Sequence, residues 1–431
     1  MAKTVEHIRQ DPSLVSGLPG EHEYQTGRLA ALCERHARRV GADAAVCVVS
    51  APGRTELAGN HTDHNNGRVL CAAVALDVLA IVTPRADTHA YVDSEGFDSL
   101  IEVDLADTAA RQDERGTPHA LLRGVAAAFS EAGRPVSGFD ATVTSDVAPG
   151  SGLSSSAAFE VFIGTTLAGL PHSGEASLQE LTGDDVLFVA RAGRRAENEY
   201  FGKPCGLMDQ LACAHGGIIS IDFSATPPRI TPVDFDFSTA GYALAVVDTG
   251  GSHADLTEDY ASIPAEMQLI ARELGGELLA ECSKDDIIQN IPRLRRRCGD
   301  RAVLRALHFF EENVRVGGMI EALSEGRAHD FLELAQHSGA SSSMLLQNYH
   351  SAKAPHEQGI ALGTELARDF FAACEHPGAA RVHGGGFAGT IQTYVPLGQW
   401  EAFVARMEEI FGAGSVTRLR LRPEAPRFLA P

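Results

Sequence analysis

The stretch "GNHTDHNNG" (59–67) places His61, Asp63 and His64 within four positions. Two histidines and a carboxylate could bind a metal, but zinc sites need three or four ligands. No H-E-x-x-H or paired-cysteine pattern elsewhere supplies the others. Asn60-His61-Thr62 is also a glycosylation sequon, which is used only in a secreted chain. The third interpretation is a loop whose polar side chains receive hydroxyl groups.

A second stretch, "PGSGLSSSAA" (149–158), has the composition of a phosphate-binding loop. A glycine-rich turn that leads into a helix leaves several backbone N–H groups aimed at one point, at the positive end of the helix dipole. This loop is not a Walker motif, because it contains no Gly-Lys pair. The chain's Gly202-Lys203 pair does not complete such a motif either, since Glu197 stands where the leading glycine would be. An ordinary capped helix is the alternative. An anion site here must rely on arginine, backbone amides or a metal, since the chain has only four lysines: Lys3, Lys203, Lys284 and Lys353.

Two further segments carry groups that could act on a bound phosphate. "ENEYFGKPCGLMDQ" (197–210) places Glu197 and Asp209 twelve residues apart around a Gly/Pro break. A carboxylate beside a phosphate loop can hold magnesium or accept a proton, although Glu197 could equally lie on a solvated helix face. "HGGGFAG" (383–389) allows close backbone approach, or forms a tight hairpin turn.

Composition limits the function classes. The chain has 431 residues and a net charge of −21, from 57 acidic and 36 basic residues. This charge argues against general binding to nucleic acid or anionic membranes. The eight cysteines are scattered without a C-x-x-C pair, which indicates reduced thiols. The start has no apolar core and no apolar run reaches membrane length, so we expect a cytoplasmic protein. The sequon then stays unused, and the glycan interpretation is dropped.

The elements that must position these residues indicate an α+β class with mixed sheets, because strands and helices do not alternate regularly. We expect strands at 46–54, ending in a Pro-Gly turn, and at 67–84, 139–150 and 241–250, with a strand–loop–strand unit at 379–396. Helices are expected at 151–170, with serine N-caps, at 183–202, and over most of 255–375. A proline-rich stretch at 225–240 predicts two domains, 1–225 and 226–431.

In this order, the motifs resemble those of the GHMP kinase superfamily, and within it the galactokinases. "APGRTELAGNHTDHNNGRVL" resembles the galactokinase signature, "PGSGLSSSAA" the phosphate loop, and "HGGGFAGT" the third motif. "AENEYFGKPCGLMDQ" is similar to the segment that carries the catalytic aspartate. The resemblance covers residues from about 30 to 395. It implies a two-domain fold, in which residues 1–225 bind the sugar and the phosphates, residues 226–431 form a C-terminal GHMP kinase domain, and the active site lies in the cleft between them. The implied reaction is ATP- and magnesium-dependent phosphorylation of galactose at its anomeric hydroxyl, giving galactose 1-phosphate.

The resemblance also implies residue roles. Asp209 would be the catalytic base and Arg54 its cationic neighbour, so the base should stay ionised and weak. Positioning and magnesium would then supply most of the catalysis. The other implied groups are Asn60, His61, Asp63, Gly206 and Tyr260 for the sugar; Pro149, Gly150, Ser151, Gly152, Leu153, Ser154, Ser155, Ser156 and Ala157 for the nucleotide phosphates; and Ser155 and Glu197 for magnesium. Sugar and ATP are the expected partners, and a monomer is favoured.

The chain departs from the family pattern at several positions, three of which we single out. The usual Val-Asn-Leu-Ile-Gly-Glu-His-Thr-Asp-Tyr is "TELAGNHTDH" at 55–64, so Asn60 replaces the glutamate that contacts the sugar's hydroxymethyl arm. His64 replaces an aromatic residue and Ala388 a glycine. The changes leave N-acetylgalactosamine, galacturonate and arabinose open as substrates. A non-catalytic sugar sensor is a different class, which the intact Asp209, Arg54 and "GLSSSA" argue against.

Overall fold

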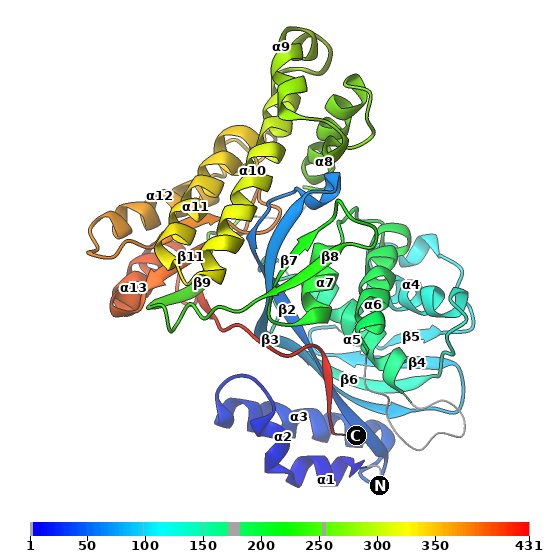
Figure 1. Cartoon of the computed structure of the whole chain (residues 1–431). Coiled ribbons are helices and arrows are strands. Elements are labelled where there is room, and N and C mark those ends of the chain that lie inside the picture. The colour runs from blue at the N-terminus through cyan, green and yellow to red at the C-terminus, as the bar shows by residue number, and fades with distance from the viewer. Residues whose placement is uncertain (1–2, 98, 149, 171–181, 252–255, 431) are drawn as a thin grey trace.

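The computed structural model describes residues 3–97, 99–148, 150–170, 182–251 and 256–430. It contains two β-sheets with helices packed around them (Figure 1). The larger sheet has nine strands in the order β1-β2-β3-β6-β4-β5, with β13 beside β2 and with β7 and β8 extending from β3. The smaller has the order β10-β11-β9-β12. Since β4 and β6 are parallel and their other neighbours antiparallel, the predicted α+β class with mixed sheets is confirmed.

Strands β2 (Ala45–Ala58) and β3 (Arg68–Pro84) form the long antiparallel pair at the centre of the molecule. The predicted turn at Pro52-Gly53 is wrong, because β2 continues through it with a register shift between Pro52 and Arg54. A bulge lets a proline sit inside a strand. Gly53 also lets the phosphate loop approach, since a Cβ there would lie 3.0 Å from the Leu153 carbonyl oxygen.

Both faces of this pair are buried, which explains the almost unbroken apolar sequence of β3. Because side chains alternate along a strand, Val46 and Val48 pack with the N-terminal helices, whereas Val49 and Ala51 pack with the helices on the other face. The N-terminal helices are α1 (Val5–Gln10), α2 (Pro12–Ser16) and α3 (His22–Val40), grouped at one end of Figure 1. On the other face lie α4 (Pro118–Glu131), α5 (Ser155–Gly169), α6 (Gly183–Arg195) and α7 (Met208–His215).

The remaining strands of the larger sheet are β1 (Lys3–Thr4), β4 (His89–Ser94), β5 (Ile101–Asp104), β6 (Phe139–Ser145), β7 (Ile218–Asp222), β8 (Arg229–Val233) and β13 (Arg427–Ala430). Strands β1 and β13 both pair with β2, on the edge that β3 leaves free. Since β8 pairs with β7, the larger sheet extends past residue 225. The division into domains at 225/226 stays a prediction.

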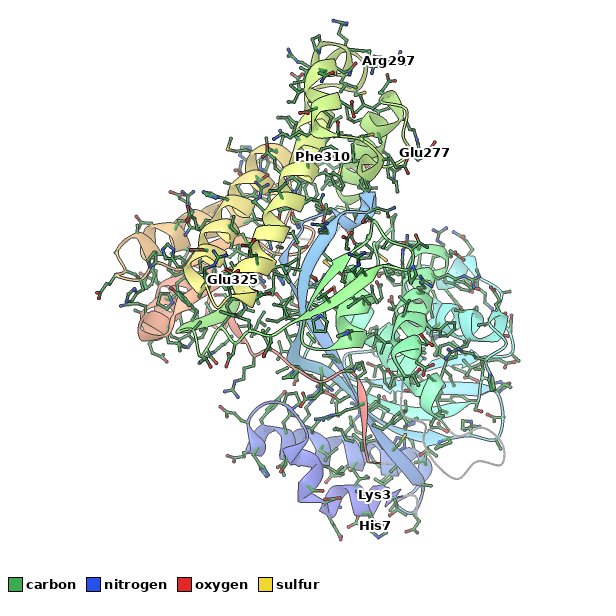
Figure 2. The ribbon with its side chains drawn as sticks, viewed as in Figure 1. Lys3, His7, Glu277, Arg297, Phe310 and Glu325 are labelled. Carbon is green, nitrogen blue, oxygen red and sulfur yellow. The ribbon has the colours of Figure 1, made fainter. Side chains whose placement is uncertain are left out.

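The smaller sheet consists of β9 (Tyr242–Asp248), β10 (Ala379–Val382), β11 (Thr390–Pro396) and β12 (Val416–Leu419). Helices α11 (Ala328–Ser341), α12 (Gly359–Ala372) and α13 (Trp400–Phe411) lie beside it. Helices α8 (Thr257–Glu273), α9 (Lys284–Cys298) and α10 (Asp300–Ser324) share a second core and form a protrusion. Figure 2 shows Arg297 at its far end and Glu277 on its side. In the part of the chain described, no helix is both long and apolar enough to span a membrane.

Candidate active site

Five segments that are distant in sequence surround one cavity of about 390 Å³. They are the end of β2 with the following loop, the phosphate loop, the segment before α7, the start of α8, and the glycine loop between β10 and β11. The structure therefore brings the predicted sugar, phosphate and catalytic segments together. The predicted residues on its wall are Arg54, Asn60, His61, Asp63, Gly150, Gly152, Ser154, Ser155, Ser156, Gly206, Asp209 and Tyr260. Ser151, Leu153, Ala157 and Glu197 are not on the wall, and Pro149 lies outside the described residues.

Arg54 and Asp209 form a bidentate ion pair in the wall of the cavity. The Arg54 Nε and Nη2 atoms donate to the two Asp209 carboxylate oxygens at 2.8 and 2.7 Å. The Ser154 hydroxyl donates to Asp209 Oδ2 at 2.6 Å. Burial alone would raise the pKa of Asp209, but the Arg54 charge and these hydrogen bonds outweigh it and lower the pKa. Asp209 is therefore ionised at neutral pH, and its fixed carboxylate lines the cavity as a hydrogen-bond acceptor.

Ser154 explains why the predicted serine caps are wrong. It is the N-cap of α5, but its φ of 59° is left-handed and its side chain makes no capping hydrogen bond. Its hydroxyl is directed to Asp209 instead. The first N–H groups of a helix have no partner within the helix, and at α5 no serine oxygen covers them in the described structure. This terminus thus presents donors and the positive dipole end toward the cavity.

Glu197 lies directly behind the start of α5, in a π-helical turn, Ala196–Phe201. Only 2% of it is exposed. Its Oε1 accepts from the Ser156 hydroxyl at 3.0 Å and from Lys203 Nζ at 3.1 Å, and its Oε2 accepts from Gln210 Nε2 at 3.0 Å. The solvated-face alternative for Glu197 is therefore wrong. A buried carboxylate beside serine hydroxyls is a set of oxygen atoms that suits magnesium.

Asp63 and His61 also line the cavity, from the loop after β2. The Asp63 carboxylate makes no hydrogen bond to the described part of the chain, and His64 Nε2 lies 3.9 Å from its Oδ1 atom. A Cβ on Gly206 would overlap this carboxylate, so glycine is required there. His61 Nε2 lies 3.0 Å from the Gly385 carbonyl oxygen and must donate to it, which leaves Nδ1 as an acceptor. Burial lowers the pKa of His61 to about 3, so the ring is neutral.

Asn60 is in the cavity wall but fully buried, and protein groups use its amide. Its Nδ2 donates to the Gly384 carbonyl oxygen at 2.6 Å and to both Glu56 carboxylate oxygens, at 3.1 and 3.3 Å. Its Oδ1 accepts from Asn348 Nδ2 at 2.7 Å. Glu56 also accepts from Arg381 Nη2 at 2.7 Å. We call Glu56, Asn60, Asn348 and Arg381 the buried polar cluster; it supports the glycine loop from behind.

The glycine loop packs directly against Tyr260 of α8. The Tyr260 hydroxyl donates to the Gly386 carbonyl oxygen at 3.1 Å. A Cβ on Gly385 would lie 2.5 Å from the Tyr260 ring, so glycine is needed for this contact. Phe387 meets the same ring edge-on, with 5.5 Å between the ring centroids. The loop thus closes the sugar side of the cavity against α8.

Among the cavity residues that sequence reasoning missed are Glu56, Lys203 and His383. Glu56 could have been found, because the chain has glutamate and asparagine at 56 and 60 where the family pattern has asparagine and glutamate. Lys203 follows Gly202 without a Walker motif, so its local sequence predicts no role for it. His383 contacts Thr390 of the neighbouring strand β11 at 3.2 Å and Thr55 of the larger sheet at 3.0 Å, and no local pattern reveals the second contact. Within the described residues no group of three or more His, Cys, Asp or Glu side chains is placed to hold a metal ion.

Comparisons with known proteins agree with this geometry. The galactokinase galactose-binding signature matches residues 34–84, and the GHMP kinases N-terminal domain matches residues 120–217. A galactokinase of Actinobacillus pleuropneumoniae serotype 5b (strain L20) is 31% identical over 357 residues, 82% of this chain and 86% of the relative. One of Streptomyces coelicolor is 31% identical over 385 residues, 88% and 92% of the two chains. The chain belongs to the galactokinases.

Solved structures show the same fold. The Lactococcus lactis galactokinase complexed with galactose superposes with a TM-score of 0.78 at 23% identity, over 93% of this chain and 99% of that one. A mevalonate kinase superposes with a TM-score of 0.61 at 15% identity, over 88% and 99%. The predicted GHMP kinase fold is confirmed. As a galactokinase, the chain binds galactose and ATP and transfers a phosphoryl group to the anomeric hydroxyl of the sugar.

Proposed function

We propose that Asp209 accepts the proton of the anomeric hydroxyl while that oxygen attacks the terminal phosphorus of ATP. The new bond joins the sugar oxygen to phosphorus, the bond from phosphorus to the bridging oxygen breaks, and ADP leaves. The observation that carries this assignment is the ionised Asp209, held by Arg54 and Ser154 between Asp63 and the start of α5. Because its pKa is lowered, Asp209 is a weak base. Its main contribution is to orient the anomeric hydroxyl for attack.

The phosphates would lie at the start of α5, where the free N–H groups and the helix dipole favour negative charge. Arg54 supports this loop as well as Asp209, since its Nη1 donates to the Gly152 carbonyl oxygen. Ser155 and Glu197 would hold magnesium, which when bound neutralises charge on the phosphates. Glu197 supports this role because it is buried and bonds the hydroxyl of Ser156 in the phosphate loop.

On the sugar side, Asp63 and the His61 Nδ1 atom are open acceptors for hydroxyl groups. A charged carboxylate accepts such bonds more strongly than a neutral group. Gly206 makes room for Asp63, and Tyr260 closes the site through the glycine loop. The predicted contact of Asn60 with the hydroxymethyl arm stays a prediction. Its saturated amide supports a different role, in which Asn60 holds Gly384 and so positions His61.

The test is Asp209→Asn, which keeps the shape and removes the negative acceptor. Turnover should fall by about 10²–10⁴-fold, with the galactose KM changed only a few-fold. Asp93→Asn is the matched control, because Asp93 forms a 2.8 Å pair with Arg35 away from the cavity. Near wild-type turnover of Asp209→Asn would remove Asp209 from its role as the base.

The substrate is tested by measuring ADP release with ATP, magnesium and a panel of sugars. Galactose should be preferred over N-acetylgalactosamine, galacturonate and arabinose. A higher kcat/KM for any of the three would show that the departures at 60 and 64 have changed the specificity.

A further inference from the structure

Lys203 is the one lysine, among the residues described, that lies on the wall of the cavity. The other three pair with surface carboxylates elsewhere: Lys3 with Asp11, Lys284 with Glu311 and Lys353 with Glu258. Lys203 instead pairs with the buried Glu197, its Nζ atom 3.1 Å from Oε1. A cation on a long side chain therefore lines the active site of a chain that is otherwise poor in lysine.

The backbone fixes where this ammonium starts. Gly202, in the left-handed region with φ of 88°, ends the π-helical turn. The N–H groups of Gly202 and Lys203 both donate to the Glu197 carbonyl oxygen, at 2.9 and 3.0 Å. Main chain and side chain of Lys203 are thus both tied to Glu197. The side chain is nevertheless 54% exposed, so its end can move while its backbone stays in place.

The ammonium lies next to the phosphate loop. Ser156, in the first turn of α5, donates to the same Glu197 oxygen that Lys203 contacts. Burial alone would lower the pKa of Lys203, but the nearby charges of Glu197 and Asp209 outweigh it and raise the pKa. The group is therefore a permanent positive charge between the start of α5 and the base.

We propose that Lys203 is a phosphate-binding residue that exchanges partners during the reaction. Its ammonium leaves Glu197 when the terminal phosphate of the nucleotide enters, and Glu197 is then free to hold the divalent cation. This step rests on the role proposed above for Glu197. The exchange is favoured by charge, because an ammonium and a divalent cation held by the same carboxylate repel each other, whereas the entering phosphate attracts the ammonium. The entering phosphate is the anion that an ammonium at this place would meet.

The decisive measurement is ATP binding without metal, by calorimetry of the full chain in EDTA. Lys203→Met removes the charge and keeps the length, and Lys203→Arg keeps the charge. Lys203→Met should bind metal-free ATP about 10- to 100-fold more weakly, as expected for loss of a charge-assisted contact. Lys203→Arg should stay within about 3-fold of wild type. Lys284→Met, which removes a lysine on the protrusion, should have no effect.

A second measurement uses Mn²⁺ alone, without nucleotide. Because Lys203 competes for Glu197, Lys203→Met should bind Mn²⁺ at least as tightly as wild type. Unchanged affinity of Lys203→Met for metal-free ATP would overturn the proposal, and so would an equal loss in Lys203→Arg. A separate result, wild-type Mn²⁺ affinity in Glu197→Gln, would refute the metal role of Glu197 but leave the ATP measurement to decide Lys203.

Discussion

Replacing Asn60 by glutamate tests the buried polar cluster. The Asn60 Nδ2 atom lies 3.1 and 3.3 Å from the two Glu56 oxygens, so a carboxylate in its place would face another carboxylate. Two unit charges about 4 Å apart repel by about 4 kcal/mol at an effective dielectric constant of about 20. That energy corresponds to a pKa shift of about 3 units. One of the two glutamates should therefore keep its proton in the folded chain up to about pH 7.

The sign of the pH dependence follows from this raised pKa. In the unfolded chain both glutamates ionise near pH 4.3. The penalty on the folded state is therefore absent below about pH 4, grows as the pH rises, and is complete above about pH 7. At about 2 °C per kcal/mol for a large domain, the apparent Tm of Asn60→Glu should fall by about 8 °C at pH 8.

The assay is thermal unfolding of four proteins between pH 4.5 and 8. Asn60→Gln is the steric control, since it has the same extra methylene without the charge. The Glu56→Gln/Asn60→Glu double variant returns the cluster to one carboxylate and should recover most of the charge-dependent loss. If Asn60→Glu and Asn60→Gln unfold at the same temperature at every pH, the Asn60 amide does not face Glu56 and the cluster is misassigned.

Three other outcomes follow from the site. Gly206→Ala should weaken galactose binding at least about 10-fold, because the new methyl group overlaps Asp63, while ATP affinity stays unchanged; calorimetry with each ligand checks this. Because the pKa of Asp209 is lowered, log(kcat/KM) should be flat from pH 8 down to about pH 5, and an acidic limb near pH 6 would contradict the ionised base. EDTA should abolish turnover, and magnesium or manganese should restore it. If metal analysis finds one zinc per chain that is lost in His61→Ala, the zinc interpretation of this loop is correct instead.

The parts of the fold that sequence could predict are those with local causes. The apolar run of β3 and the glycine-rich loops gave correct elements, because strand burial and glycine freedom are local properties. Two local rules failed where distant groups intervene. The Ser154 hydroxyl bonds Asp209 rather than capping α5, and β2 passes through Pro52 because β3 continues the pairing. A pattern in one segment cannot show which side chain of another segment will bond its hydroxyl group, or which strand will pair with its edge.

The site shows the same division. Arg54 and Asp209 share the cavity as the resemblance implies, since both motifs were recognisable. The partners of Asn60 were not predictable, because Asn348 and Gly384 lie 288 and 324 residues further along the chain. Lys203 was visible in sequence, but only the folded chain shows its pairing with Glu197.

The short strands at the two ends of the described chain protect the molecule against aggregation. Strands β1 and β13 cover the edge of β2 at positions 45–46 and 48–50. Without them, the unpaired N–H and C=O groups of an apolar strand would offer a template to another molecule. Trimming residues 427–430 should therefore promote self-association of the protein, even though these residues are distant from the catalytic pair. A protein fused to the C-terminal end should be joined through a linker that leaves β13 free to pair with β2.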